Sequence, residues 1–375
     1  MIYLDHAATA PLSRHALEAM TPYLTTEFGN PSSVYAPGRR ARRALDAARE
    51  TVAAAFGAHP DEIYFTSGGT ESDNWAIRTA ASCSGKKHII VSSVEHHAVL
   101  RSAAAMKAEG FETTALGVDG ECRVLPGSVK QAADSGTALV SVMAANNEVG
   151  TIMPVAELAA EAHKAGALFH TDAVQAAGHI PLDVRKLGVD LMSFSAHKFG
   201  GPKGIGGLYV RRGVPVRPGM NGGGQERGLR SGTENVAGIV GAAAALQEAC
   251  RTMRENTAKL TALRNRLIRG VLAIPGSRLT GCPENRLPGN ASFVFDGVEG
   301  EALVFLLDSS GVCASSGSAC SAGALEPSHV LLAMGLPETS ARGSLRLTLG
   351  PENTESEIDA VLKLLPPIIF RLRGE

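Results

Sequence analysis

Ser195-Ala-His-Lys-Phe-Gly-Gly-Pro-Lys-Gly204 is the stretch around which the chain is organised. It lies between two apolar, strand-like runs, residues 189–194 and 205–210. Lys198 is therefore expected where a buried strand ends and a glycine-rich turn begins, with little water around its amine. Desolvation lowers the pKa of a lysine, and a Schiff base with an aldehyde requires a neutral amine. A lone lysine in such a place is more often a surface residue on a turn. The other motifs of the chain must therefore show whether Lys198 is catalytic.

Strand and helix signals alternate over the first two thirds of the chain. This alternation is the βαβ pattern of a parallel sheet that helices cover on both faces. The expected strands are residues 62–65, 88–92, 138–143 and 167–171, besides the two runs around Lys198. The expected helices are residues 37–56, 70–81, 95–109, one opening at Pro154, and a long one over 235–272. The five arginines of the first helix (Arg39, Arg40, Arg42, Arg43, Arg49) predict a solvated face.

A different pattern follows Pro275. Strands are expected at residues 291–295 and 345–349, and helices at 299–309 and 354–365. The last helix opens with a capping box, in which Thr354 and Glu357 satisfy each other's backbone amides. We expect a smaller α+β unit here, hinged on the long helix.

Composition excludes several classes of protein. The 375 residues are 44% hydrophobic and carry 36 Lys and Arg against 37 Asp and Glu, which favours neither nucleic acid nor an anionic membrane. The N-terminus does not read as a signal peptide, and no apolar run reaches the length of a membrane span. The six cysteines form no CxxC pair, so we expect no metal site and no disulfide framework. A reducing, cytoplasmic location is the corresponding expectation.

Two motifs predict an anion site. Thr66-Ser-Gly-Gly-Thr-Glu-Ser72 reads as a strand, a glycine turn and a helix N-terminus, where free N–H groups and the helix dipole attract phosphate. Gly69 and Thr70 would supply the backbone and a hydroxyl. Ser195 and His197 add a second hydroxyl and an imidazole beside Lys198. The glycine motif alone is weak evidence, because glycine before a helix is more often only a turn.

Asp172 is expected at the end of a buried strand. A buried carboxylate is costly unless a cation accompanies it, and the protonated ring nitrogen of pyridoxal phosphate is such a cation. Gln175, one turn further on, could reach the ring oxygen. The alternative is an Asp that caps the next helix. His96 could stack on a planar ring or handle protons, or could simply begin a helix.

Cys320 lies in Ser315-Ser-Gly-Ser-Ala-Cys-Ser-Ala-Gly323, which has no hydrophobic periodicity. Because structural cysteines are usually buried among apolar side chains, we expect this thiol to be exposed on a mobile segment. Cys313, beside a strand-like pair, fits a core thiol. Nothing around the other four cysteines suggests a function.

The order of these motifs resembles that of the fold-type-I pyridoxal-phosphate enzymes of the aminotransferase class V group: Ser-Gly-Gly-Thr70, Asp172-Ala-Val-Gln175, and Lys198 after Ser-Ala-His. Further motifs narrow the resemblance to the cysteine desulfurases that supply sulfur for iron–sulfur clusters. These are Tyr-Leu-Asp-His-Ala-Ala-Thr9, Phe-Gly-Asn-Pro-Ser-Ser33, Glu95-His96, Asn-Asn-Glu-Val-Gly150, Gly228-Leu-Arg-Ser-Gly-Thr-Glu-Asn235 and the Cys320 segment. The spacing from Cys320 to Arg346 is similar to that of the subgroup with the longer catalytic loop.

The resemblance implies an α/β fold like that of aspartate aminotransferase, with a mainly parallel sheet of seven-stranded type and a smaller α+β domain. Residues 15–258 would form the large, cofactor-binding domain. Residues 1–14 and 259–375 would form the small domain that carries the Cys320 loop.

The resemblance also implies a role for each site residue. Lys198 would bind the aldehyde of pyridoxal 5'-phosphate and move the substrate Cα proton, and His96 would stack on the ring and shuttle protons. Asp172 and Gln175 would hold the ring nitrogen and ring oxygen. The phosphate would be held by Gly69, Thr70, Ser195, His197 and, from the second subunit of a homodimer, Thr233. Asn147 and Arg346 would hold the substrate carboxylate, for which the planar fork of Arg is suited.

The implied reaction converts L-cysteine to L-alanine and leaves the sulfur on Cys320 as a persulfide, for an iron–sulfur scaffold or another acceptor. The sequence closes with residues 366–375, without the longer tail of some relatives, which leaves the acceptor open. Alternatives are a selenocysteine lyase or cysteine β-lyase of the same fold, in which Cys320 is dispensable, and a non-catalytic sulfur-relay protein. A thiol redox or metal-binding protein is disfavoured because the chain has no CxxC pair.

Overall fold

The computed structural model describes residues 1–317 and 326–375. Within them, the larger sheet has seven strands in the order β2-β8-β7-β6-β5-β3-β4. Neighbouring strands from β4 to β7 run parallel, and β8 runs antiparallel to both β7 and β2. The expected mainly parallel sheet is therefore confirmed. The strands are β2 (Ile63–Thr66), β3 (His88–Ser92), β4 (Glu112–Leu116), β5 (Thr137–Ser141), β6 (Leu168–Asp172), β7 (Leu191–Ser195) and β8 (Gly206–Val210).

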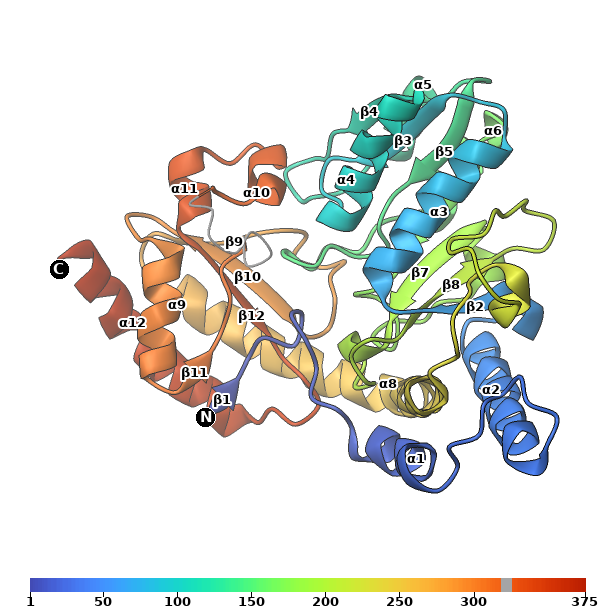
Figure 1. Ribbon diagram of the computed structural model, residues 1–375. Helices are drawn as coiled ribbons and strands as arrows, with labels where there is room; N and C mark the ends of the chain where they lie inside the picture. The colour runs from blue at the N-terminus through green and yellow to red at the C-terminus, as the bar shows by residue number, and fades with distance from the viewer. Residues whose placement is uncertain (318–325) are drawn as a thin grey trace.

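Helices cover both faces of this sheet (Figure 1). On one face Ile77 and Val99 from α3 and α4 pack with Ile89 and Leu139 of the strands. On the other face a larger core includes residues of α2, α6 and α8. Because helices cover both faces, the central strands β5, β6 and β7 are buried at nearly every position rather than alternating between buried and exposed residues. The helices of this part are α1 (Arg14–Thr25), α2 (Ala36–Ala55), α3 (Gly69–Cys83), α4 (His97–Met106), α5 (Pro126–Ala132), α6 (Val155–Lys164), α7 (Val184–Leu187) and α8 (Val236–Leu272).

The C-terminal third builds a second, antiparallel sheet in the order β12-β10-β9. Its strands are β9 (Ser277–Leu279), β10 (Asn290–Phe295) and β12 (Ser344–Thr348), and a further pair joins β1 (Ile2–Tyr3) in parallel to β11 (Val312–Cys313). The helices here are α9 (Gly300–Ser309), α10 (His329–Ala333), α11 (Glu338–Arg342) and α12 (Glu355–Arg373). A separate core of Phe293, Phe295 and their neighbours lies between this sheet and the helices.

Helix α8 links the two cores. It has 37 residues and is therefore about 55 Å long. Its first half, around Leu246, packs in the core of the large sheet, and its second half, around Leu263, packs in the core of the small sheet. The proposed boundary at residue 258 falls between these halves and stays a prediction. No helix in the described part of the chain is long and apolar enough to cross a membrane.

The final helix extends past its predicted end. α12 continues through Pro366 and Pro367 to Arg373. A proline inside a helix costs about 3 kcal/mol because it removes a backbone hydrogen bond and crowds the preceding turn. Leu365 and Ile369 are buried on the two sides of the proline pair, and their packing offsets that cost.

Candidate active site

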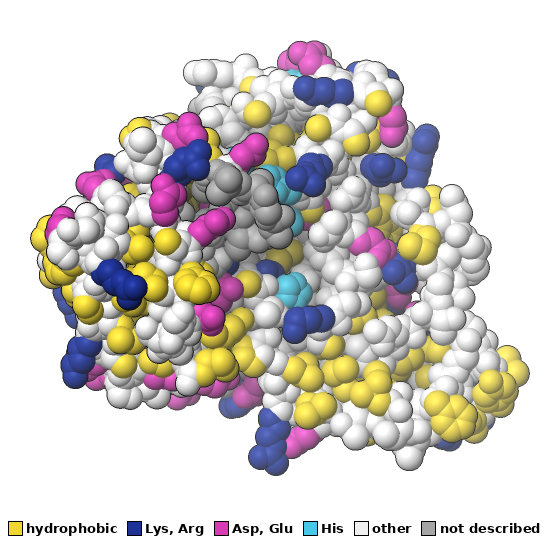
Figure 2. Space-filling model, turned by 60° about the vertical axis from the view of Figure 1, so that its left-hand side comes forward, with side chains coloured by type: hydrophobic (Ala, Val, Ile, Leu, Met, Phe, Trp, Pro, Cys, Tyr) yellow, Lys and Arg dark blue, Asp and Glu magenta, His cyan; other side chains and the backbone are white. Residues whose placement is uncertain are grey.

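A cavity of about 290 Å³ lies where the parallel strands β3, β5, β6 and β7 end. Ligands of open α/β sheets commonly bind at such carboxyl edges. The cavity brings together every predicted cofactor and substrate residue except Thr233: Gly69, Thr70, His96, Asn147, Asp172, Gln175, Ser195, His197, Lys198 and Arg346. Figure 2 shows histidine side chains at the surface near the middle of one face, with basic side chains beside them.

Lys198 ends a single 3-10 turn, Ala196–Lys198, that directly follows β7. Its half-buried side chain donates from Nζ to the carbonyl oxygens of Ala7 and Ala8, at 2.6 and 2.8 Å. Gln175 Nε2 donates to the same Ala7 oxygen at 2.9 Å. The chain's N-terminal segment therefore forms one wall of the site, and sequence reasoning missed this wall.

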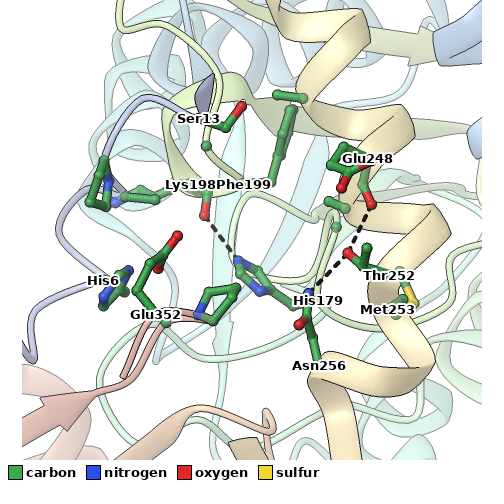
Figure 3. A pocket seen from close by; sticks show the side chains of 18 of the residues that line it. His6, Ser13, His179, Lys198, Phe199, Glu248, Thr252, Met253, Asn256 and Glu352 are labelled. Atoms are coloured by element: carbon green, nitrogen blue, oxygen red, sulfur yellow. Dashed lines mark hydrogen bonds between the residues drawn. The ribbon is translucent and has the colours of Figure 1, made fainter. Parts of the chain in front are cut away.

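The backbone of Lys198 is held from the opposite side. Its carbonyl oxygen accepts a hydrogen bond from His179 Nε2 at 3.0 Å. Behind this bond lies a second, larger cavity of about 520 Å³, bordered by His179, Phe199, Glu248 and other residues (Figure 3). Lys198 thus lies between two cavities, with its amine directed to the one that holds the predicted site.

Asp172 ends β6 and is buried. Burial raises its pKa to about 6, against the lowering effects of the Val174 amide and of Lys198. Its Oδ1 accepts from the Val174 N–H at 2.8 Å. The residues that follow, 173–179, form turns rather than a helix, so Asp172 is not the helix cap that the alternative interpretation required.

A second buried carboxyl group, Asp73, also lines the cavity. Its Oδ1 has no hydrogen-bond partner among the described residues and lies 3.7 Å from His170 Nε2. Burial lowers the pKa of His170 to about 3, so this imidazole is neutral. Burial and the neighbouring Asp172 raise the pKa of Asp73 well above its usual range. This acidic wall fits a positively charged ring atom. Asp73 lies three positions after Thr70 on α3, and that helical spacing was the available sequence signal.

The anion seat forms at the start of α3. Gly69 is its first residue, where a Cβ atom would lie 2.6 Å from Val174 Cγ2. The first N–H groups of a helix have no partner within it, so they can bind a phosphate. His197 Nδ1 lies 3.2 Å from Thr9 Oγ1. Burial and the nearby Lys198 and Lys203 lower the pKa of His197 to about 4.

His96 begins a helix, as one of its two interpretations predicted, while its role toward a planar ring stays a prediction. It is the N-cap of α4, where its Nδ1 accepts from the Ala98 N–H at 3.1 Å, and its ring lines the cavity. Burial, followed by Lys198 and His97, lowers its pKa to about 4. Since Nδ1 accepts a hydrogen bond, the neutral ring carries its proton on Nε2.

Arg346 lies on β12 at the other end of the cavity. Its Nη1 donates to the Asn147 carbonyl oxygen at 3.0 Å, and its Nη2 donates to Asp5 Oδ1 at 2.9 Å. Its buried Nε has no partner within residues 1–317 and 326–375. An arginine held by its tip in this way presents a fixed positive charge to a carboxylate.

One predicted residue, Thr233, lies outside this cavity, and a second, Cys320, is not among the described residues. Thr233 is exposed and lines a separate cavity of about 70 Å³ with Ser67 and Glu226. Its predicted role toward a second subunit stays a prediction. Cys320, and with it the predicted mobile thiol, lies outside the described residues.

The sequence model of the aminotransferase class-V family matches residues 2–361. The chain belongs to this family. It is 50% identical to a protein of Methanosarcina thermophila named cysteine desulfurase IscS, over all of this chain and 93% of that protein. Among solved structures, a NifS-like protein is 41% identical, with a TM-score of 0.93 over 98% of this chain and 99% of the other. SspA, solved in complex with cysteine, is 33% identical, with a TM-score of 0.83 over 94% and 100%.

Proposed function

We propose that the chain is a pyridoxal-phosphate-dependent cysteine desulfurase that converts L-cysteine to L-alanine and transfers the sulfur to Cys320. The observation that carries the proposal is one cavity lined by the Lys198 amine, the buried Asp172 carboxyl and the Arg346 guanidinium. The 50% identity to a cysteine desulfurase over the whole chain supports it.

The donor set fits the cofactor. Asp172, beside the acidic Asp73, would hold the ring nitrogen, and Gln175 the ring oxygen. His96 would lie against the ring. The start of α3 with Gly69 and Thr70, together with Ser195 and His197, would hold the phosphate. When bound, pyridoxal phosphate supplies an electron sink for the negative charge left by removal of the substrate Cα proton.

The remaining residues act on the substrate. Arg346 and Asn147 would hold the carboxylate of L-cysteine, and Lys198 would take the Cα proton and return it to the product. The Cys320 thiolate would attack the substrate sulfur, forming an S–S bond while the C–S bond breaks and its electron pair stays with carbon. Protonation of that carbon gives alanine, so cysteine and one protein thiol yield alanine and one persulfide.

We further propose a homodimer in which Thr233 reaches the phosphate in the other subunit. The persulfide would pass to a protein acceptor, such as an iron–sulfur scaffold.

The test is spectroscopic and kinetic. The wild-type protein should be yellow with pyridoxal phosphate and bleach on borohydride reduction, whereas Lys198→Ala should lack the band. L-cysteine should yield alanine, and Cys320→Ala should release no sulfide under reductant. Sulfide release retained in Cys320→Ala would favour a lyase instead.

A further inference from the structure

Glu148 directly follows the proposed substrate residue Asn147 and is buried. Its backbone is fixed on both sides. Its N–H donates to Asn146 Oδ1 at 2.9 Å, and its carbonyl oxygen accepts from Asn290 Nδ2 at 3.3 Å. The carboxyl group is therefore presented from a rigid loop after β5.

One oxygen of this carboxyl group lies against residues on both sides of the Cys320 segment. Glu148 Oε2 accepts a hydrogen bond from Ser328 Oγ. A Cβ atom placed on Gly317 would lie 2.8 Å from the same Oε2 atom. Gly317 is also tied to β12, because its N–H donates to Ser344 Oγ at 3.2 Å. Gly317 and Ser328, which precede and follow Cys320 in the sequence, thus both lie beside one carboxylate oxygen.

The same carboxyl group lies in the field of the substrate arginine. Burial raises the pKa of Glu148 to about 7, and the Ser328 hydrogen bond and the Arg346 charge oppose that rise. A buried carboxyl group costs more free energy than an apolar side chain of similar volume. Packing alone therefore gives no reason for an acid here, whereas a hydrogen-bonded anchor near Arg346 does.

We propose that Glu148 is a positioning residue for sulfur transfer: it holds Gly317 and Ser328, which flank Cys320 in the sequence, against the loop of Asn147. This inference rests on the proposed function, since it concerns the step in which Cys320 receives sulfur. Glu148 acts through these anchors and touches neither substrate nor cofactor.

The experiment separates sulfur transfer from the chemistry at the Cα atom. Glu148→Ala and Ser328→Ala are compared with wild type for single-turnover persulfide formation, for iodoacetamide alkylation of Cys320 followed by mass spectrometry, and for Cα hydrogen exchange of L-alanine in heavy water. A misplacement of about 1 Å can cost roughly a hundredfold in rate. We expect persulfide formation to fall about tenfold to a hundredfold, alkylation to change, and Cα exchange to stay near the wild-type rate. Glu284→Gln, an exposed acid before β10, is the control.

A pair of substitutions, one that enlarges Gly317 and one that shortens Glu148, gives a measurement that a purely structural role of Glu148 would leave unchanged. Gly317→Ala places a methyl group against Glu148 Oε2 and should slow persulfide formation. Glu148→Asp withdraws the carboxyl group by one methylene, so the double variant should transfer sulfur faster than Gly317→Ala alone.

The outcomes are distinct. Wild-type persulfide and alkylation rates in Glu148→Ala and Ser328→Ala overturn the inference while the proposed function stands, and so does a double variant no faster than Gly317→Ala. Alanine formation from L-cysteine that persists in Cys320→Ala overturns the proposed function and the inference together.

Discussion

Replacing Arg49 by Met should destabilise the protein more than any exposed arginine of the same helix. Arg49 Nη1 donates to Glu226 Oε2 at 2.9 Å and to the Ile63 carbonyl oxygen at 2.7 Å, and both charged side chains are buried. Glu226 Oε2 also accepts from the Phe65 N–H at 3.0 Å. This pair fastens α2 to the edge strand β2 and to the 3-10 turn Gln225–Gly228.

The expected magnitude follows from burial. Removing one partner of a buried ion pair leaves an uncompensated charge and costs about 3–5 kcal/mol. The turn also contains Glu226 and Arg227 at φ of +47° and +60°, a conformation that costs about 1 kcal/mol or more per non-glycine residue. Without Arg49, fewer contacts stabilise the left-handed conformation of Glu226 and Arg227, and the loop that leads to Thr233 should become more mobile.

The assay is urea unfolding at equal cofactor loading, followed by circular dichroism. Arg43→Met is the matched control, because Arg43 is exposed on the same helix and surface substitutions usually stay within about 0.5 kcal/mol. The double variant Arg49→Met/Glu226→Gln removes both charges and should lose less than the sum of its single variants. A loss below about 1 kcal/mol in Arg49→Met, or strict additivity in the double variant, would refute the reasoning.

Three further predictions concern the cavity residues Gly69 and Asp172 and the buried Glu95, which precedes His96. Burial raises the pKa of Glu95 to about 8, so the folded state holds this proton more tightly than the unfolded state does. The associated stability is present below about pH 4.5 and is lost as the pH rises through about 8. Glu95→Gln should therefore gain in Tm relative to wild type between pH 6 and pH 9, and a constant difference would contradict the assignment. Gly69→Ala, whose methyl would lie 2.6 Å from Val174 Cγ2, should weaken pyridoxal-phosphate binding about tenfold or more; unchanged affinity in an absorbance titration would exclude the predicted phosphate seat. Asp172→Asn should weaken the same binding by about thirtyfold or more, since truncating a buried charge pair costs at least about 2 kcal/mol, and equal affinities would show that no charge pairs with the ring nitrogen.

The sequence predicted those features that depend on a short-range pattern of apolar and polar residues. The strand at residues 88–92 agrees with β3 residue for residue, because a continuous apolar run there is bounded by polar residues. Asp172 and Lys198 were found because Asp172 directly follows the strand-like run 167–171 and Lys198 lies four positions after the run 189–194. The edge strand β4 was missed because Glu112-Thr-Thr-Ala-Leu116 is polar and half exposed, and α1 was missed because it contains Pro22.

Features that depend on distant parts of the chain left no local signal. The carbonyl oxygens of Ala7 and Ala8 accept hydrogen bonds from Lys198 Nζ across about 190 positions. Because every residue has a backbone carbonyl group, the sequence does not indicate which of them bind the lysine. Arg49 was predicted on a solvated face, and this prediction was wrong: the residue is 7% exposed. Its burial left no signal in the sequence, because its partner Glu226 is 177 positions away.

The wall made by the first residues has a consequence for synthesis on the ribosome. Ala7 is held in place by the Ile2–Tyr3 pairing with Val312–Cys313, and the Leu4 carbonyl accepts from the Thr348 N–H at 2.7 Å. These partners are synthesised after the whole of the large sheet, whereas the residues they bind are synthesised before it. The large sheet can therefore form on a nascent chain, but the carbonyl groups that orient the lysine come into position only after Val312–Cys313 and Thr348 have been added. Activity should therefore appear later in synthesis than the folding of the large sheet.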